Sequence, residues 1–164
     1  AIREQMDILD AKGIAYEVVP GVSSFTAACA SIKKEFTLPD VSQTIILTRI
    51  EGRTPVPEEE DLESLARHRA SMAIFLSVQE IGRVVEKLVK GYGVDDIPVA
   101  VVYKATWEDE KVILGTLRDI EEKVKKEGIN KTAQILVGRF IKGEYERSKL
   151  YDPEFSHEFR SRRR

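Results

Sequence analysis

The sequence contains few of the residue groupings that perform chemistry on their own. It has no Gly-x-Gly-x-x-Gly segment after an apolar run and no Gly-Lys-Ser loop of the kind that cradles phosphate. Its two histidines, His68 and His157, lack the spacing of metal ligands, and no Ser/His/Asp arrangement can be argued. The acidic run at residues 58–60 is better explained as the start of a helix, where negative charge is favourable. We therefore expect no catalytic side chain and no metal ion.

Residues that could bind a ligand gather instead at four turns, each after a predicted strand. The carboxyl ends of strands are where α/β sheets bind ligands. Residues 20–24 (PGVSS) offer backbone N–H groups and two hydroxyls at a helix start, which suits a carboxylate or another polar group. Residues 49–55 (RIEGRTP) combine two arginines, which can hold carboxylates bidentately, with a rigid proline. The other two turns are residues 76–77 (LS) and 103–106 (YKAT), the latter with a small residue where a backbone could approach a ligand. Taken one at a time, each turn is better explained by the small and capping residues that such connections need.

Composition excludes several classes of partner. The 164 residues carry 26 basic and 28 acidic side chains, a net charge of -2, so no field favours nucleic acid or an anionic membrane. The basic run at residues 160–164 is interpreted as a terminal tail. The one cysteine, Cys29, lies among alanines and is predicted to be a small buried hydrophobe in a reducing compartment. No apolar run reaches the ~18 residues of a membrane span and no signal peptide is recognisable, so we expect a cytoplasmic protein.

Apolar runs bounded by turn residues predict strands that alternate with helices. The strands are expected at residues 14–19, 44–48, 72–76, 98–103, 111–114 and 133–138, and the helices at 1–10, 25–34, 58–67, 79–90 and 117–127. This alternation is typical of the α/β class. The run at 111–114 is expected to pair back on 98–103 through a turn at Trp107, which predicts a mixed, mostly parallel sheet flanked by helices.

Five segments, in this order, resemble the tetrapyrrole (corrin and porphyrin) methyltransferase family. They are VVPGVSS (18–24), LTRIEGRTPVPE (47–58), AIFLS (73–77), VAVVYKATWEDEK (99–111) and QILVG (134–138). The second and fourth are long and specific, whereas PGVSS and AIFLS are shared more widely among related methylases. Within the family the resemblance is greatest to the branch that methylates carbon 11 of precorrin-4 or cobalt-precorrin-4 in cobalamin biosynthesis. It extends over about residues 1–141.

The resemblance implies that S-adenosylmethionine is the cofactor and that it lies in a cleft between two α/β domains. Ser23 and Ser24 match a small pair that contacts the cofactor on its methionine and ribose side. Leu76 matches an apolar residue near the adenine, and Ala105 matches a backbone contact to the adenine edge.

The substrate implied by the resemblance is a tetrapyrrole, precorrin-4 or its cobalt form. Arg49, Glu51 and Arg53 match a loop near that substrate, and we expect them to meet its carboxylates. The implied reaction is a direct displacement in which a ring carbon attacks the sulfonium methyl group. Such a reaction needs alignment more than acid–base help, which agrees with the absence of a recognisable triad or metal motif.

The family's Gly-x-Gly-Pro-Gly-Asp and Gly-Asp-Pro segments do not occur in this sequence. We expect residues 1–19 to be the last helix and strand of a truncated N-terminal domain, 20–141 a C-terminal α/β methylase domain, and 142–164 a charged tail. The parent enzyme is expected to be a homodimer, and the fragment alone to be inactive. Two alternatives stay open: a methylase acting on uroporphyrinogen or precorrin-2, and a non-catalytic binding or dimerisation module.

Overall fold

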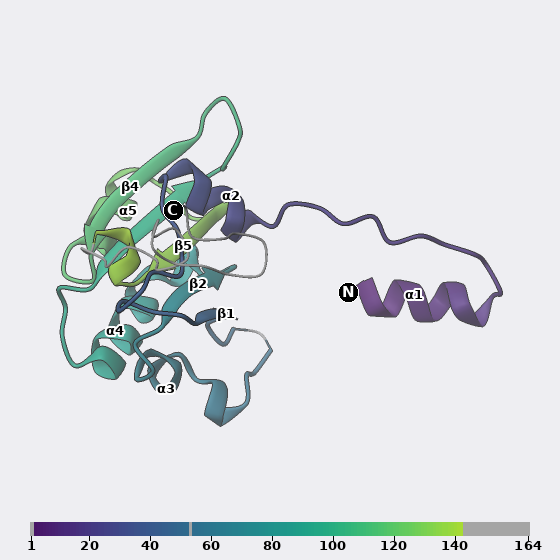
Figure 1. Cartoon of the computed structure of the whole chain (residues 1–164), viewed down its shortest axis with the longest axis horizontal. Coiled ribbons are helices and arrows are strands. Elements are labelled where there is room, and N and C mark those ends of the chain that lie inside the picture. Colours follow the sequence, from purple (N-terminus) through teal and green to yellow (C-terminus); the bar gives the residue numbers. More distant parts are fainter. Residues whose placement is uncertain (1, 53, 143–164) are drawn as a thin grey trace, which may run out of the picture.

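A five-stranded sheet forms the centre of the protein (Figure 1). The computed structural model describes residues 2–52 and 54–142. The strands lie in the order β1 (Ile45–Arg49), β2 (Ser71–Phe75), β5 (Ala133–Val137), β3 (Pro98–Tyr103) and β4 (Lys111–Thr116). The predicted α/β class and mixed sheet are confirmed, and β3 and β4 form the expected antiparallel pair.

The expectation that the sheet is mostly parallel is wrong. Only β1 and β2 pair in parallel, whereas β2–β5, β5–β3 and β3–β4 are antiparallel. Strands β1, β2 and β3 do run in the same direction, because β2 and β3 are both antiparallel to β5. Strand β5, the last in chain order, lies between β2 and β3. A parallel β2–β3 pair is thereby replaced by two antiparallel pairs, β2–β5 and β5–β3.

Helices cover both faces of the sheet. On one face α3 (Leu62–Ala66), α4 (Ile81–Tyr92) and α5 (Ile120–Lys126) contribute to the larger core, together with the short 3-10 helix η2 (Val78–Glu80). On the other face α2 (Ser24–Ser31) packs with η3 (Arg139–Ile141) in a smaller core. Strand β3 shows why its sequence is continuously apolar: Val99 and Val101 enter the larger core, whereas Ala100 and Val102 enter the smaller one.

Cys29 lies in the smaller core, as predicted for a small buried hydrophobe. Its thiol donates a hydrogen bond to the backbone carbonyl of Lys34. Burial, aided by the negative charge of Glu35, raises the pKa of the Cys29 thiol to about 11. The group is therefore protonated and unreactive at neutral pH.

Helix α1 (Ile2–Ala11) and the extended segment that follows it, together residues 2–19, lie apart from the sheet-bearing body (Figure 1). The helix has no buried residue. The strand predicted at residues 14–19 is instead an extended segment, because no neighbouring strand among the described residues pairs with it. Its apolar side chains are exposed, with Val19 77% accessible.

Two predicted helices are shorter than expected because acidic residues interrupt or delay them. The helix predicted at 58–67 divides into the 3-10 helix η1 (Glu58–Glu60) and α3. Asp61, between the two, has an extended ψ of 140°, and its carboxylate accepts from the backbone N–H of Glu63 as an N-cap. The helix predicted at 117–127 begins only at Ile120, after the carboxylate of Asp119 accepts from the N–H of Thr116. The tail predicted at 142–164 lies, from residue 143 onward, outside the described residues.

Two glycines of α4 give a matched test of the packing between α4 and α3. A Cβ at Gly91 would lie 2.3 Å from the backbone oxygen of Glu63, whereas one at Gly82 would meet only the flexible end of the Glu121 side chain. We expect Gly91→Ala to lower the free energy of unfolding by about 2 kcal/mol, because backbone atoms of α3 must move. Gly82→Ala should leave the free energy of unfolding unchanged or raise it by up to about 1 kcal/mol, which is the difference in helix propensity between alanine and glycine. Urea unfolding measures both, and equal effects would contradict the assigned packing.

Candidate functional site

The cleft of this protein lies at one edge of the sheet. The carboxyl ends of β1, β2 and β3 and the amino ends of β4 and β5 meet there, as the strand pairings require. The β1–β2 ladder extends to the pair Arg49–Phe75, but the β2–β5 ladder stops one step earlier, at Ile74–Ile135. Strands β2 and β5 therefore part at this edge, and we call the opening between Phe75 and Gln134 the fork.

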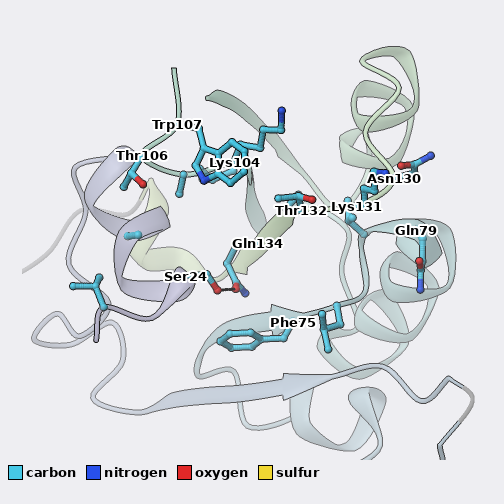
Figure 2. A pocket seen from close by; sticks show the side chains of 17 residues that line it. Ser24, Phe75, Gln79, Lys104, Thr106, Trp107, Asn130, Lys131, Thr132 and Gln134 are labelled. Carbon is cyan, nitrogen blue, oxygen red and sulfur yellow. Dashed lines mark hydrogen bonds between the residues drawn. The ribbon is translucent and has the colours of Figure 1, made fainter. Parts of the chain in front are cut away.

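A cavity of about 540 Å³ occupies the fork and the space above it. Its walls come from the start of α2, the residues after β2, the β3–β4 turn and the segment before β5. Figure 2 shows Ser24 and Gln134 joined at the floor, with Phe75 on one side and Trp107 and Lys104 on the other. We call this cavity the edge cleft.

Three of the four residues predicted to bind a cofactor line the edge cleft: Ser24, Leu76 and Ala105. They come from three different turns, so the structure brings together the segments that the sequence singled out. The fourth, Ser23, caps α2 beside the cleft without lining it. Its backbone oxygen accepts from the hydroxyl of Thr26 at 2.7 Å, and its side chain makes no capping bond.

The backbone around the edge cleft is strained. Four lining residues that are not glycine adopt left-handed φ angles: Leu76 (+53°), Lys104 (+47°), Thr106 (+74°) and Thr132 (+55°). Such conformations cost roughly 1–2 kcal/mol each and concentrate at functional sites. Leu76 is also 83% exposed, so the strain presents an apolar side chain to the cleft and to solvent rather than to the core.

Lys104 holds one rim of the edge cleft. Its ammonium lies 5.1 Å from the ring centroid of Tyr103 and 5.2 Å from that of Trp107, close enough for cation–π attraction to both. The hydrogen bond to the Asp109 carboxylate raises the pKa of Lys104 above its ordinary value. The indole of Trp107, although 60% exposed, lines the cleft beside this ammonium.

Gln134 is a cleft residue that the sequence analysis did not identify. Its side chain is almost fully buried, lines the cleft, and donates to the backbone carbonyl of Ile74 at 3.0 Å. Its amide oxygen accepts from the hydroxyl of Ser24 at 2.9 Å. The available signal was a polar residue inside the apolar strand sequence AQILV. A buried amide with both ends paired indicates a specific role in shaping the site.

Ser77 ties the ends of β1 and β2 together. It directly precedes η2 but makes no side-chain cap bond to that helix. Its buried hydroxyl instead accepts from the N–H of Ile50 and donates to the carbonyl of Phe75.

Two of the residues predicted to bind substrate lie at the carboxyl end of β1: Arg49 is its last residue, and Glu51 follows in the next loop. Arg49 directs its guanidinium at its own loop, donating to the backbone carbonyls of Ile50, Thr54 and Pro55. Arg53 lies outside the described residues. A second cavity of about 450 Å³ lies beside this loop, and Glu51 and Asp61 are among the residues that line it.

Glu51 belongs to an ion-pair network with α4. Its carboxylate lies 2.6 Å from Arg83 and 3.1 Å from Lys87, and Lys87 also pairs with Asp61. Partial burial acts to raise the pKa of Glu51, but hydrogen bonds and the charges of Lys87 and Arg83 outweigh it, so the net pKa is lowered. The hydrogen bond from Lys87 likewise lowers the pKa of Asp61. Both carboxylates are therefore ionised at neutral pH.

Within residues 2–52 and 54–142, no group of three or more His, Cys, Asp or Glu side chains could hold a metal ion. In the same part of the chain, no helix has the length and apolar character needed to cross a bilayer. His157 lies outside it.

The family model of the tetrapyrrole (corrin/porphyrin) methylases matches residues 1–121. The chain belongs to this family. Among curated members, it is 58% identical over 161 residues to cobalt-precorrin-4 C(11)-methyltransferase of Methanocaldococcus jannaschii. That match covers 98% of this chain but 62% of the relative, so the chain spans less than two thirds of the relative's length.

Solved structures of methylases agree with this assignment. A cobalt precorrin-4 methyltransferase structure superposes with a TM-score of 0.83 at 47% identity, covering 86% of this chain and 59% of the other. Uroporphyrin-III C-methyltransferase of Thermus thermophilus, solved in complex with S-adenosylhomocysteine, gives a TM-score of 0.67 at 19% identity. It covers 84% of this chain and 59% of that one, and at this identity the likeness concerns the fold alone.

The left-handed backbone of Leu76 in this methylase chain predicts an unusual order of stabilities. Alanine normally stabilises a chain relative to glycine, but a left-handed residue reverses the preference. We expect Leu76→Gly to have a free energy of unfolding about 0.5–1 kcal/mol higher than Leu76→Ala. Urea unfolding of the two variants is the measurement. A more stable Leu76→Ala would mean that residue 76 is not left-handed in solution.

The Lys87 network predicts a pH-dependent stability. Lys87→Met leaves two partly buried carboxylates without this cation and should lower the free energy of unfolding by about 1 kcal/mol at pH 7. Because the folded pKa values of Glu51 and Asp61 are lowered, this stabilisation exists above their ordinary values of 4.5 and 3.8 and is lost as the pH falls through the folded values. The gap between native protein and variant should therefore narrow in acid.

Lys90→Met, on the same helix, is the control for this effect. Lys90 pairs with Glu86, and both side chains are exposed, so we expect little change in stability. If Lys87→Met and Lys90→Met lowered the free energy of unfolding equally, the network would contribute no more to stability than an exposed ion pair.

Proposed function

We propose that this chain is the C-terminal part of an S-adenosylmethionine-dependent methyltransferase that methylates carbon 11 of precorrin-4 or cobalt-precorrin-4 in cobalamin biosynthesis. The observation that carries the proposal is the edge cleft, which brings together three of the predicted cofactor residues in a chain 58% identical to cobalt-precorrin-4 C(11)-methyltransferase. The methylase fold bound to S-adenosylhomocysteine in a distant relative supports the choice of cofactor.

The residues of the edge cleft fit the parts of this cofactor. Adenine is flat and apolar on its faces, and the exposed side chain of Leu76 offers it an apolar surface. Ala105, with only a methyl side chain, lets the adenine edge approach the backbone. Ser23 and Ser24 lie at the start of α2, where polar groups of the methionine and ribose portions could be bound. We assign these four residues to cofactor binding.

The chemistry that S-adenosylmethionine supplies when bound is an electrophilic methyl group on a sulfonium. The residues of this chain are assigned to binding and orientation, because a displacement at a methyl group depends on alignment of the two reactants. Hydrogen bonds of Gln134 and Glu110 hold the cleft walls, with their left-handed residues, in one geometry before any ligand arrives.

Arg49, Glu51 and Arg53 are proposed to face the tetrapyrrole. Three of the five N–H donors of Arg49 are used by its own loop, which leaves two for a substrate carboxylate. Glu51 fixes the loop to α4 through Arg83 and Lys87. Arg49 therefore holds the far side of the loop, and Glu51 holds the loop against α4.

The domain arrangement is also a proposal. Residues 1–19 are assigned to an N-terminal domain, 20–141 to the C-terminal α/β methylase domain, and 142–164 to a tail. The exposed apolar side chains of α1 and the following segment, such as Ile8 and Val19, support packing against a further part of the protein. A homodimer in the cytoplasm and an inactive isolated fragment stay predictions.

Two alternatives are distinguished from this function by their acceptor. A uroporphyrinogen or precorrin-2 methylase would transfer methyl to those tetrapyrroles, and a binding or dimerisation module would transfer it to none. The 58% identity to a C(11)-methyltransferase favours methylation of carbon 11 over both alternatives.

Ala105→Leu tests the cofactor assignment. The larger side chain would fill the slot where the adenine edge is proposed to lie, and we expect the Kd for S-adenosylhomocysteine to rise roughly tenfold or more. Ala30→Leu, on the exposed surface of α2 and outside the cleft lining, is the matched control and should bind normally. Calorimetric titration of the full-length natural protein provides the values. Normal binding by Ala105→Leu would remove this residue from the site.

Methyl transfer by the full-length natural protein tests the reaction itself. With S-adenosylmethionine and either precorrin-4 or cobalt-precorrin-4, mass spectrometry should detect one added methyl group, which NMR should locate at carbon 11. Transfer only to uroporphyrinogen or precorrin-2 would overturn the proposed substrate.

A further inference from the structure

Gln134 occupies the point where the sheet opens into the edge cleft. The β2–β5 ladder ends at Ile74–Ile135, so the next residue of β5 toward the cleft, Gln134, has no strand partner on β2. Its side chain takes over that role: Nε2 donates to the Ile74 carbonyl at 3.0 Å. With only 4% of its surface exposed, Gln134 forms the floor of the fork.

The Ile74 carbonyl determines which way the Gln134 amide points. A backbone carbonyl can only accept a hydrogen bond, so the group facing it must be the NH₂ of the amide. The amide oxygen then faces Ser24. Since an amide oxygen can only accept, the Ser24 hydroxyl must donate its single proton to Gln134, at 2.9 Å.

Helix α2, which carries Ser24, is held at its other end as well. Ser31 donates from its hydroxyl to the Glu110 carboxylate at 3.0 Å, and the same carboxylate accepts from the N–H of Thr106 at 2.6 Å. The two contacts fix α2 to β5 at its start and to the β3–β4 turn at its end. Ser24 is therefore presented to the cleft in a defined position.

We propose that Gln134 is a positioning residue that makes Ser24 a hydrogen-bond acceptor toward the edge cleft. Once its proton is committed to Gln134, the Ser24 hydroxyl has only lone pairs for a ligand. The inference rests on the proposed function and sharpens it: the part of the cofactor at Ser24 is a donor, either the α-ammonium or a ribose hydroxyl. The α-carboxylate, which the turn sequence alone equally suits, does not bind to this hydroxyl.

The test measures how strongly Ser24→Ala weakens binding of a series of ligands to the full-length natural protein. The ligands are S-adenosylhomocysteine, its analogue without the α-amino group, its analogue without the α-carboxylate, and its 2′-deoxy and 3′-deoxy analogues. Ser24→Ala should raise the Kd of the parent compound roughly three- to tenfold, the worth of one hydrogen bond. The ratio of the Ser24→Ala Kd to the Kd of the unmodified protein should be the same for the compound without the carboxylate. It should fall to about one for the analogue that lacks the donor, which identifies the ammonium or the hydroxyl concerned.

Gln134→Met tests the positioning role, because methionine has a similar shape but no amide. Freed of Gln134, the Ser24 hydroxyl can turn and donate, so the variant should lose the preference for ligands that carry the donor. Ser24→Ala added to Gln134→Met should then change the Kd of S-adenosylhomocysteine by less than twofold. Gln43→Met, the same change just before β1 at the opposite end of that strand, should leave all ratios unaltered. Thermal melting of each variant verifies that it is folded.

Three results would overturn the inference. One is a Ser24→Ala ratio that falls to one only for the compound without the carboxylate, which would make Ser24 a donor to that group. Another is a Ser24→Ala ratio that is equal for every ligand of the series. The third is a Gln134→Met variant with unchanged ligand preferences. Absence of any S-adenosylhomocysteine binding by the unmodified protein would instead overturn the proposed function, and this inference with it.

Discussion

The insertion of β5 between β2 and β3 is the constraint on which the edge cleft depends. Strands β2 and β3 run in the same direction, so their carboxyl ends would lie side by side if they were neighbours. Strand β5 separates them and enters from the cleft edge, pairing with β3 up to Ala133 but with β2 only up to Ile135. The unequal length of these two ladders leaves the opening. Ligands of α/β sheets bind in a crevice outside the carboxyl ends of the strands, and the parting of β2 and β5 provides such a crevice here.

Rigidity of the cleft walls follows from hydrogen bonds made by three side chains, of which Ser77 and Gln134 are buried and Glu110 is half-buried. Ser77 joins the ends of β1 and β2, Gln134 joins β5 to β2 and α2, and Glu110 joins α2 to the β3–β4 turn. These bonds offset the cost of the left-handed residues, which would otherwise relax to ordinary conformations. A wall fixed in this way suits a reaction whose barrier is lowered by alignment.

The sequence predicted the sheet-forming segments of the body to within one or two residues, since each is an apolar run bounded by turn residues. It could not predict that most pairings are antiparallel, because strand order depends on contacts between distant parts of the chain. The segment at 14–19 had the composition of a strand, but a strand also requires a neighbour. Three of the residues predicted to bind the cofactor line the edge cleft, and the sequence could single them out because they lie in turns. Gln134 was missed because it lies within a strand, and the role of its amide depends on Ile74 and Ser24, which are far from it in sequence.

The single cysteine of the chain gives the fold an internal reporter. Cys29 is on α2, within the smaller core, with its thiol hydrogen-bonded and protonated at neutral pH. Alkylating reagents reach such a sulfur only when α2 separates from the sheet. The rate of its modification therefore counts the openings of the helix that carries Ser24, and a ligand that bridges α2 and the sheet would slow that rate in proportion to its occupancy.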